Sequence, residues 1–204
     1  MDINNLNIML LDVLKEIGNI GSGNAATALA SMINKKINMD VPQVKILDFN
    51  EVANILGGAE KPVVGIYFEM SGDIKGSIMF ILNIDSARCL LNLLFKSSNE
   101  RDEFTDMDMS ALSEVGNILA ASYINSLSTL SNMVLKISVP SIAFDMAGAI
   151  LSVPAIQFGY ISDKVLFIET QFKEGNNQVT GNLFLIPELD SFETMLKKLG
   201  VVGI

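Results

Sequence analysis

The sequence contains one short segment twice, and this repetition constrains the fold more than any other feature. Residues Leu14–Ile20 read LKEIGNI, and residues Leu112–Ile118 read LSEVGNI. The pair Val41-Pro42 recurs as Val139-Pro140, and both recurrences are separated by 98 positions. Similarity at a fixed spacing indicates that one structural unit occurs twice in the chain.

The similarity continues in two apolar segments of each half. Val64–Glu69 corresponds to Val165–Glu169, and Gly76–Leu82 corresponds to Gly181–Pro187, at a slightly longer spacing. We therefore predict a single domain, residues 1–204, made of two tandem repeats. Their boundaries are expected at about residues 1–98 and 99–204.

The apolar periodicity predicts the elements of each repeat. Long helices are expected at about Asn5–Asn34 and Asp106–Asn132, and Thr105–Asp108 offers short oxygen-bearing side chains that can cap the second helix. The fold class is therefore α+β: a two-layer pseudo-twofold domain with two long helices packed on an antiparallel β-sheet. The other predicted elements are a strand at Val44–Phe49, a short helix at Glu51–Gly57, a hairpin of Val63–Met70 with Ile74–Leu82, a hairpin of Val165–Phe172 with Val179–Ile186 joined through Gly175–Asn177, helices at Asp85–Lys96 and Leu189–Leu199, and a short helix followed by a strand within Met146–Tyr160.

Composition excludes several classes of function. The formal net charge is −9 and no basic cluster interrupts it, which argues against nucleic-acid binding, because phosphate contacts dominate that affinity. Histidine is absent, so Ser-His-Asp and Cys-His catalysis and His-based zinc sites are excluded. The single cysteine, Cys89, follows the pattern of a core residue in an apolar helix.

The chain is half apolar, which raises the question of a membrane. Its two long uncharged stretches, Val115–Leu135 and Met146–Ser162, contain repeated Ser, Asn, Gln or Pro residues. A bilayer demands about 20 continuous, predominantly apolar residues. The first residues also lack the basic and apolar regions of a secretory signal. We therefore expect a cytoplasmic protein without membrane insertion.

Both long helices are predicted to have an apolar and a polar face, at about 100° per residue. Glu16 and Asn19 lie one turn apart on the polar face of the first helix, and Glu114 and Asn117 lie likewise on the second. The residues predicted to face inward are Leu10, Leu14, Ile17, Gly21, Ala25, Ala28 and Met32 in the first helix, and Leu112, Val115, Leu119, Tyr123 and Leu130 in the second.

A Glu-x-x-Asn pair on an exposed helix commonly has no role beyond keeping that face of the helix solvated. Here other polar residues of the helix differ between the two copies, as in Lys15 against Ser113, whereas Glu and Asn are the same in both. Asparagine is also a poor residue for the middle of a helix, so helix propensity does not explain it. The pattern therefore indicates a function for the pair, although a packing role stays open.

The full pattern resembles the signature of a known family, the CheC/CheX/FliY chemotaxis phosphatases. The signature reads Asp/Ser-x3-Glu-x2-Asn-x22-Pro, and the resemblance covers essentially the whole chain. Two intact motifs are similar to the CheC type. The matching residues are Asp12, Glu16, Asn19 and Pro42 in the first copy, and Ser110, Glu114, Asn117 and Pro140 in the second.

The resemblance implies a hydrolase that removes the aspartyl phosphate of phosphorylated CheY, the response regulator. CheY would bring its own lysine and divalent metal, Mg²⁺ being expected, so the chain needs no cofactor of its own. Asn19 and Asn117 would orient the attacking water, because a carboxamide both donates and accepts hydrogen bonds. Glu16 and Glu114 would pair with the lysine of CheY. The Asp/Ser and Pro positions have structural roles in the family.

The resemblance also implies binding to the receptor deamidase CheD. In CheC-type proteins the deamidase docks after the second motif proline, where this chain has Phe144–Ala149. Asp145 is the only charge in that segment and is the expected recognition point, with a helix cap as the alternative role. For the whole chain, the alternative to an enzyme is a non-catalytic module that binds CheY or sequesters CheD.

Overall fold

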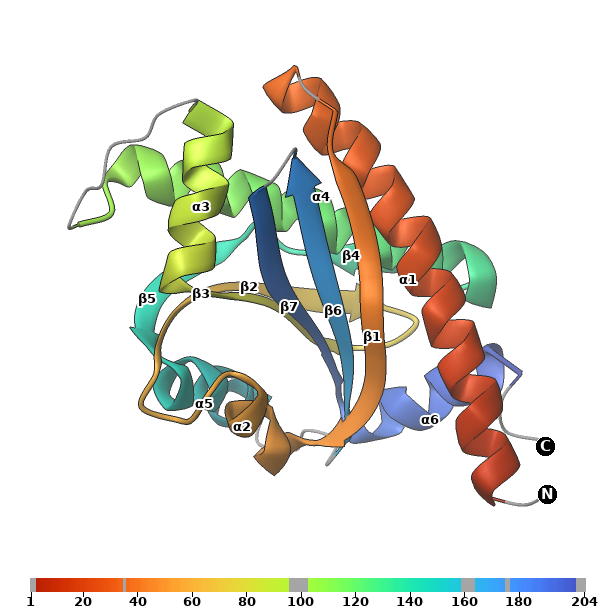
Figure 1. Ribbon diagram of the computed structural model, residues 1–204. Helices are drawn as coiled ribbons and strands as arrows, with labels where there is room; N and C mark the ends of the chain where they lie inside the picture. Colours follow the sequence, from red (N-terminus) through yellow and green to blue (C-terminus); the bar gives the residue numbers. More distant parts are fainter. Residues whose placement is uncertain (1–2, 35, 96–102, 159–163, 175–176, 201–204) are drawn as a thin grey trace.

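The computed structural model describes residues 3–34, 36–95, 103–158, 164–174 and 177–200. Figure 1 shows two long helices, α1 and α4, beside a strongly curved sheet. The elements are α1 (Ile3–Ile33), β1 (Asn38–Asp48), the 3-10 turn η1 (Phe49–Glu51), α2 (Val52–Ile55), β2 (Pro62–Gly72), β3 (Gly76–Asn83), α3 (Ile84–Phe95), α4 (Asp106–Ser131), β4 (Leu135–Ile137), β5 (Ser141–Met146), α5 (Ala147–Phe158), β6 (Lys164–Glu174), β7 (Asn177–Pro187) and α6 (Leu189–Lys198).

The sheet joins the two halves of the chain by exchanging strands between them. Its order is β1-β6-β7-β3-β2-β4, with β5 also paired to β2, and every pairing is antiparallel. The first strand of the N-terminal half, β1, pairs with the C-terminal hairpin, and β4 and β5 pair with the N-terminal hairpin. Pairing of β3 with β7 joins the hairpins at the centre. Neither half could therefore keep its sheet alone.

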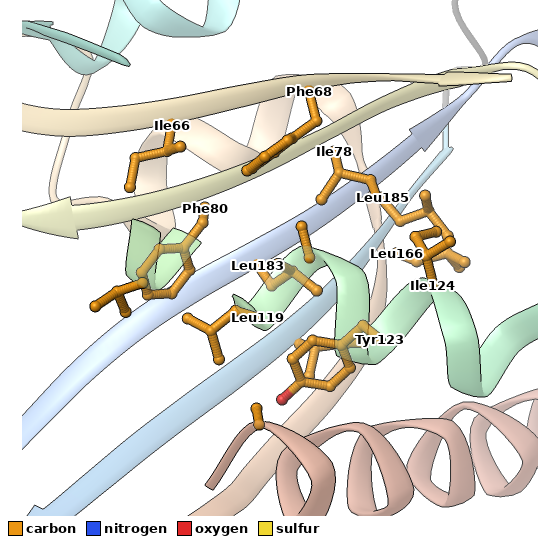
Figure 2. Packing of buried hydrophobic residues seen from close by; sticks show 14 of the residues in the cluster. Ile66, Phe68, Ile78, Phe80, Leu119, Tyr123, Ile124, Leu166, Leu183 and Leu185 are labelled. Carbon is orange, nitrogen blue, oxygen red and sulfur yellow. The ribbon is translucent and has the colours of Figure 1, made fainter. Parts of the chain in front are cut away.

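One face of the sheet carries the main core beneath α1 and α4. Figure 2 shows Ile66, Phe68 and Phe80 of the central strands facing Leu119 and Tyr123 of α4. The two helices meet where Gly21 of α1 lies against the ring of Tyr123, and the Tyr123 hydroxyl is 3.0 Å from Thr170 Oγ1 in β6. Burial raises the pKa of Tyr123 to about 12, although the hydrogen bond with Thr170 partly opposes the rise.

The other face of the sheet carries a second, smaller core. The strand residues Val63, Met79 and Phe184 contribute to it, and α5 covers it with Ile150. Gly65 of β2 leaves room for Ile150. A β-carbon on Gly65 would stand 2.5 Å from Ile150 Cγ2. The short helix α2 lies beside α5 on this face (Figure 1). Within the described ranges, no helix is long and apolar enough to span a membrane.

The predicted α+β fold with two long helices on an antiparallel sheet is confirmed, as are both long helices and both hairpins. Thr105 caps α4 as predicted: its Oγ1 accepts from the Asp108 amide, and Asp108 Oδ2 accepts from the Thr105 amide. The first strand is longer than predicted, because β1 begins at Asn38. Gly175 and Asn176 of the predicted second hairpin connection lie outside the described residues.

Two predictions were wrong in part. Helix α5 occupies residues 147–158, so the strand expected within Met146–Tyr160 is not found there; residues 159 and 160 lie outside the described ranges. Ala28, Met32 and Leu130, which were predicted to face inward, are exposed. The buried stripe instead continues in steps of four residues and ends at Ile33 in α1 and Ser131 in α4. Rows of residues four apart are inclined to the helix axis, so a helix that crosses its neighbour buries such a row.

Candidate functional site

The two Glu-x-x-Asn pairs lie in the middle of α1 and α4, on the sides that face away from the sheet. Glu16, Asn19 and Glu114 are exposed, and Asn117 is half-buried. Their side chains form no hydrogen bond or ion pair with any other part of the chain that the structure describes. Both amides and both carboxylates are therefore available to a molecule that approaches from solvent.

A glycine between the Glu and the Asn sets each helix close to the sheet. A β-carbon on Gly18 would lie 3.2 Å from Val41 Cγ1 of β1, and one on Gly116 would lie 2.8 Å from Ile66 Cδ1 of β2. A larger residue would have to lift the helix or displace the strand side chain. The glycines therefore help to fix the height and rotation at which the flanking Glu and Asn are presented.

Sequence reasoning did not assign a role to these glycines. A signal was available, because Gly18 and Gly116 are identical in the two copies and lie inside each motif. Glycine costs about 1 kcal/mol relative to alanine within a helix. Its occurrence at both positions thus points to a close approach, which the structure locates at Val41 and Ile66.

The motif prolines lie where the strand that follows each long helix is interrupted. In β1 the register with β6 shifts between Asp40 and Gln43, around Pro42. In the second half, Pro140 stands between β4 and β5, which both pair with β2. Proline has no amide hydrogen to contribute to a ladder and is confined to such irregular positions.

The two motifs are supported by different strands. Val41 of β1 lies beneath Gly18, but Val139, at the corresponding position of the second half, is 83% exposed. Gly116 is supported by Ile66 of β2 instead. In the second interruption, the Ser138 amide donates to the Glu69 carbonyl and Ser138 Oγ accepts from the Glu69 amide, which holds residue 138 against β2. The two sites thus share the Glu and Asn pair, but different strand residues support the helix beneath each pair.

A surface hollow on α1 does not include either pair. It has a volume of about 560 Å³ and lies along the last turns of α1, between residues such as Thr27, Asn34 and Lys36. Among the described residues, no group of three or more Cys, Asp and Glu side chains could hold a metal ion. The Glu and Asn side chains stand on open helix surfaces, a geometry suited to a macromolecular partner that supplies the rest of a reaction centre.

Asp145 lies in β5, and its side chain is exposed. Its Oδ1 accepts from the amide of Met146 at 2.7 Å. The first amides of α5 are bonded elsewhere, from Ala147 to the Lys61 carbonyl and from Gly148 to the Ala59 carbonyl. The Asp145 carboxylate therefore bonds the amide directly before α5, and neither of the first two amides of the helix.

The surroundings of Asp145 are apolar and open. Phe144 is exposed, and its ring centroid lies 5.1 Å from that of Phe104, which precedes α4. Met146, on the other side of Asp145, is exposed as well. Because β5 pairs only with β2, its other edge has no neighbouring strand among the described residues.

Comparison with known proteins gave concordant results. The model of the CheC-like family matches residues 9–46 and 107–143, which contain the two motifs. The chain is 36% identical over 197 residues to the CheY-P phosphatase CheC of Bacillus subtilis, covering 93% of both chains. It is 20% identical over 195 residues to a putative CheY-P phosphatase, CheC1, of Halobacterium salinarum, covering 95% of this chain and 98% of that one.

The fold is also similar to that of a solved structure. The crystal structure of Thermotoga maritima FliY superposes with a TM-score of 0.73 at 22% sequence identity, covering 98% of both chains. At that identity the likeness concerns the fold alone.

Proposed function

The chain belongs to the CheC-like family, and from this membership we propose that it is a phosphatase acting on the aspartyl phosphate of the chemotaxis response regulator CheY. The Bacillus subtilis relative, named for that activity, matches over nearly the entire length of both chains. The observation that carries the proposal is the placement of the two pairs. The Asn19 amide is exposed and the Asn117 amide is half-buried, and each lies one turn from an exposed carboxylate.

Hydrolysis of an aspartyl phosphate requires few catalytic groups from this protein. An acyl phosphate already has a good leaving group, so its hydrolysis needs an in-line water and stabilisation of charge. CheY would supply a lysine and a divalent metal, for which Mg²⁺ is the expected ion. The missing part is a group that holds the water.

Asn19 and Asn117 fill that role in the proposal. The amide oxygen accepts a hydrogen bond from the water, while the amide nitrogen can donate to a phosphoryl oxygen. The water oxygen then bonds to phosphorus as the bond from phosphorus to the aspartyl oxygen breaks, releasing phosphate and a free aspartate. Holding the water in line removes part of the entropic barrier, and the amide needs no titration to act.

Glu16 and Glu114 are proposed to dock the helix by pairing with the lysine of CheY. Each carboxylate lies one turn before its Asn on the same helix face. An ion pair at that spacing would fix the docking angle of the helix, and so bring the Asn amide of the same motif to the phosphorylated site. Neither glutamate has to accept a proton in this scheme.

The test is phosphate release from phosphorylated CheY by the full chain and by Asn19→Ala, Asn117→Ala and the double variant. We expect each single variant to lose the turnover of its own site and the double variant to be inactive while keeping the melting temperature of the parent. Asn24→Ala is the matched control: Asn24 is exposed on α1, about 140° around the helix from Asn19 at about 100° per residue. A fully active double variant would refute the role of the amides.

The same variants separate the alternatives. A non-catalytic module that binds CheY predicts that the chain releases no more phosphate than CheY alone. A packing role predicts that the substitutions lower the melting temperature. Loss of an exposed or half-buried amide that bonds no other described residue should leave the melting temperature unchanged.

We further propose that CheD binds at the surface around Asp145. The exposed aspartate lies between the exposed apolar side chains of Phe144 and Met146, on a strand with an open edge among the described residues. Such an edge offers main-chain hydrogen bonds, and the side chains offer selectivity. Asp145→Lys is expected to abolish capture of the chain by immobilised CheD without changing phosphatase activity measured in the absence of CheD. Retained capture by the Asp145→Lys variant would show that CheD binds at another surface of the chain.

A further inference from the structure

Beyond the Glu and Asn pairs, the two motif helices share an exposed methionine. Met9 of α1 is 44% exposed and Met107 of α4 is 67% exposed. The two residues are 98 positions apart, the same spacing that relates Glu16 to Glu114. We infer that Met9 and Met107 are apolar docking contacts through which each helix binds the phosphorylated response regulator, and thus set substrate affinity at each site.

Helical geometry places each methionine beside its Glu and Asn. Met9 precedes Glu16 by seven residues, which is about 20° around the helix and about 10 Å along it. Ile20, which follows Asn19 directly, is 37% exposed and lies about 40° from Glu16 on the same side. Apolar side chains therefore flank the polar pair at both ends. In α4, Met107 and the half-buried Ile118 have the same relation to Glu114 and Asn117.

A protein that places an aspartyl phosphate on Asn19 must also cover the surface around it. A specific interface buries about 800 Å² on each partner, a patch much wider than two helical turns. Met9 therefore falls within the footprint of any regulator that the Glu and Asn engage. Methionine suits the task, since its flexible, polarizable side chain adapts to the surface of a partner.

The exposed apolar residues at the other ends of the helices provide the contrast. Met32 of α1 and Leu130 of α4 are each 43% exposed, as much as Met9. At about 100° per residue, each lies about 160° around its helix from Glu16 or Glu114. They therefore match the docking residues in helix and chemistry and differ in the face that they occupy.

The inference rests on the proposed function, because it assigns the docking contacts of the same sites. The experiment measures steady-state hydrolysis of phosphorylated CheY one site at a time. Met9→Ala is placed in the Asn117→Ala background and Met107→Ala in the Asn19→Ala background, with Met32→Ala and Leu130→Ala as the matched controls. Light scattering follows the oligomeric state of every variant.

Removal of a buried methionine side chain from an interface is expected to raise KM about tenfold. The kcat should stay within about twofold, since the amide still holds the water. Both controls should keep the parental KM. An unchanged KM in the Met9 and Met107 variants, with the Asn variants inactive, would overturn this inference and leave the proposed function standing.

Two further outcomes are distinguishable. If the Asn19/Asn117 double variant kept full activity, the proposed function itself would fail, whatever the methionine variants did. If the methionine variants changed the oligomeric state and left KM unchanged, the exposed methionines would be contacts with a second copy of this chain, and the inference would be wrong.

Discussion

Gly21 of α1 lies against the face of Tyr123 of α4, so closely that a β-carbon on Gly21 would stand 2.6 Å from Tyr123 Cδ1. This contact sets the distance between the two helices that carry the Glu and Asn pairs. The Tyr123 ring is itself held from below, because its hydroxyl is hydrogen-bonded to Thr170 of β6. The relative position of the two sites thus depends on one glycine and one anchored ring.

Gly21→Ala should destabilise the protein by about 1–3 kcal/mol, because the added methyl group overpacks a contact that the anchored ring cannot easily leave. Urea denaturation monitored by circular dichroism measures the loss. Gly23→Ala is the control: a β-carbon there would have no heavy atom within 4 Å, so the higher helix propensity of alanine should stabilise by up to about 1 kcal/mol. Equal effects of the two substitutions would contradict the packing account.

Gly116→Ala should lower both stability and phosphatase activity more than Gly18→Ala does. The β-carbon would meet Ile66 Cδ1 at 2.8 Å and Cγ2 at 2.9 Å, whereas on Gly18 it meets Val41 Cγ1 at 3.2 Å. We expect a loss of about 1–3 kcal/mol at Gly116 and nearly none at Gly18, where helix propensity offsets the contact.

Adding Ile66→Ala to Gly116→Ala tests the cause of that loss. Removing the isoleucine side chain should restore part of the kcat, because the helix can return to its position, even though Ile66→Ala alone leaves a cavity and costs about 2–5 kcal/mol. Strictly additive effects on kcat would show that the glycine does not act through Ile66.

Alkaline pH should destabilise the fold through Tyr123. Its pKa is raised to about 12 by burial, against 10.0 for the free side chain. Between those values the unfolded chain loses the proton and the folded chain keeps it, so the stabilisation present below pH 10 is lost as pH rises towards 12. One such group gives a slope of at most about 1.4 kcal/mol per pH unit.

Tyr123→Phe should remove that contribution to the slope, measured by urea denaturation between pH 9 and about 11. Because the substitution leaves the buried Thr170 hydroxyl without its partner, the double variant Tyr123→Phe/Thr170→Val is the better comparison for absolute stability. The parental slope in both variants would mean that other groups dominate the alkaline response.

Thr105→Ala should destabilise the start of α4 by about 1 kcal/mol, because the Asp108 amide loses its acceptor. Thr105→Ser, which keeps the hydroxyl, should cost much less. Thermal unfolding of the three proteins gives the comparison, and a serine variant as unstable as the alanine variant would point to the methyl group instead of the cap.

The local elements of this fold could be predicted because their signals are local. The apolar residues of α1 and α4 recur at helical spacing, and the hairpins alternate between turn residues and β-branched or aromatic runs. The direction of Glu16 and Asn19 followed from the same periodicity. The errors at Ala28, Met32 and Leu130 arose because the inclination of the buried row depends on the helix crossing, which no single helix encodes.

By itself, then, the sequence determined that two long helices each present a Glu and an Asn on the side away from an antiparallel sheet. Only the tertiary structure decided that β1 pairs with β6 and that β5 pairs with β2, and hence that Gly18 is supported by Val41 and Gly116 by Ile66. The reason is physical: the face of a helix depends on residues three and four positions apart. The partner and register of a strand depend on packing between residues far apart in the chain, and many pairings satisfy the same alternation.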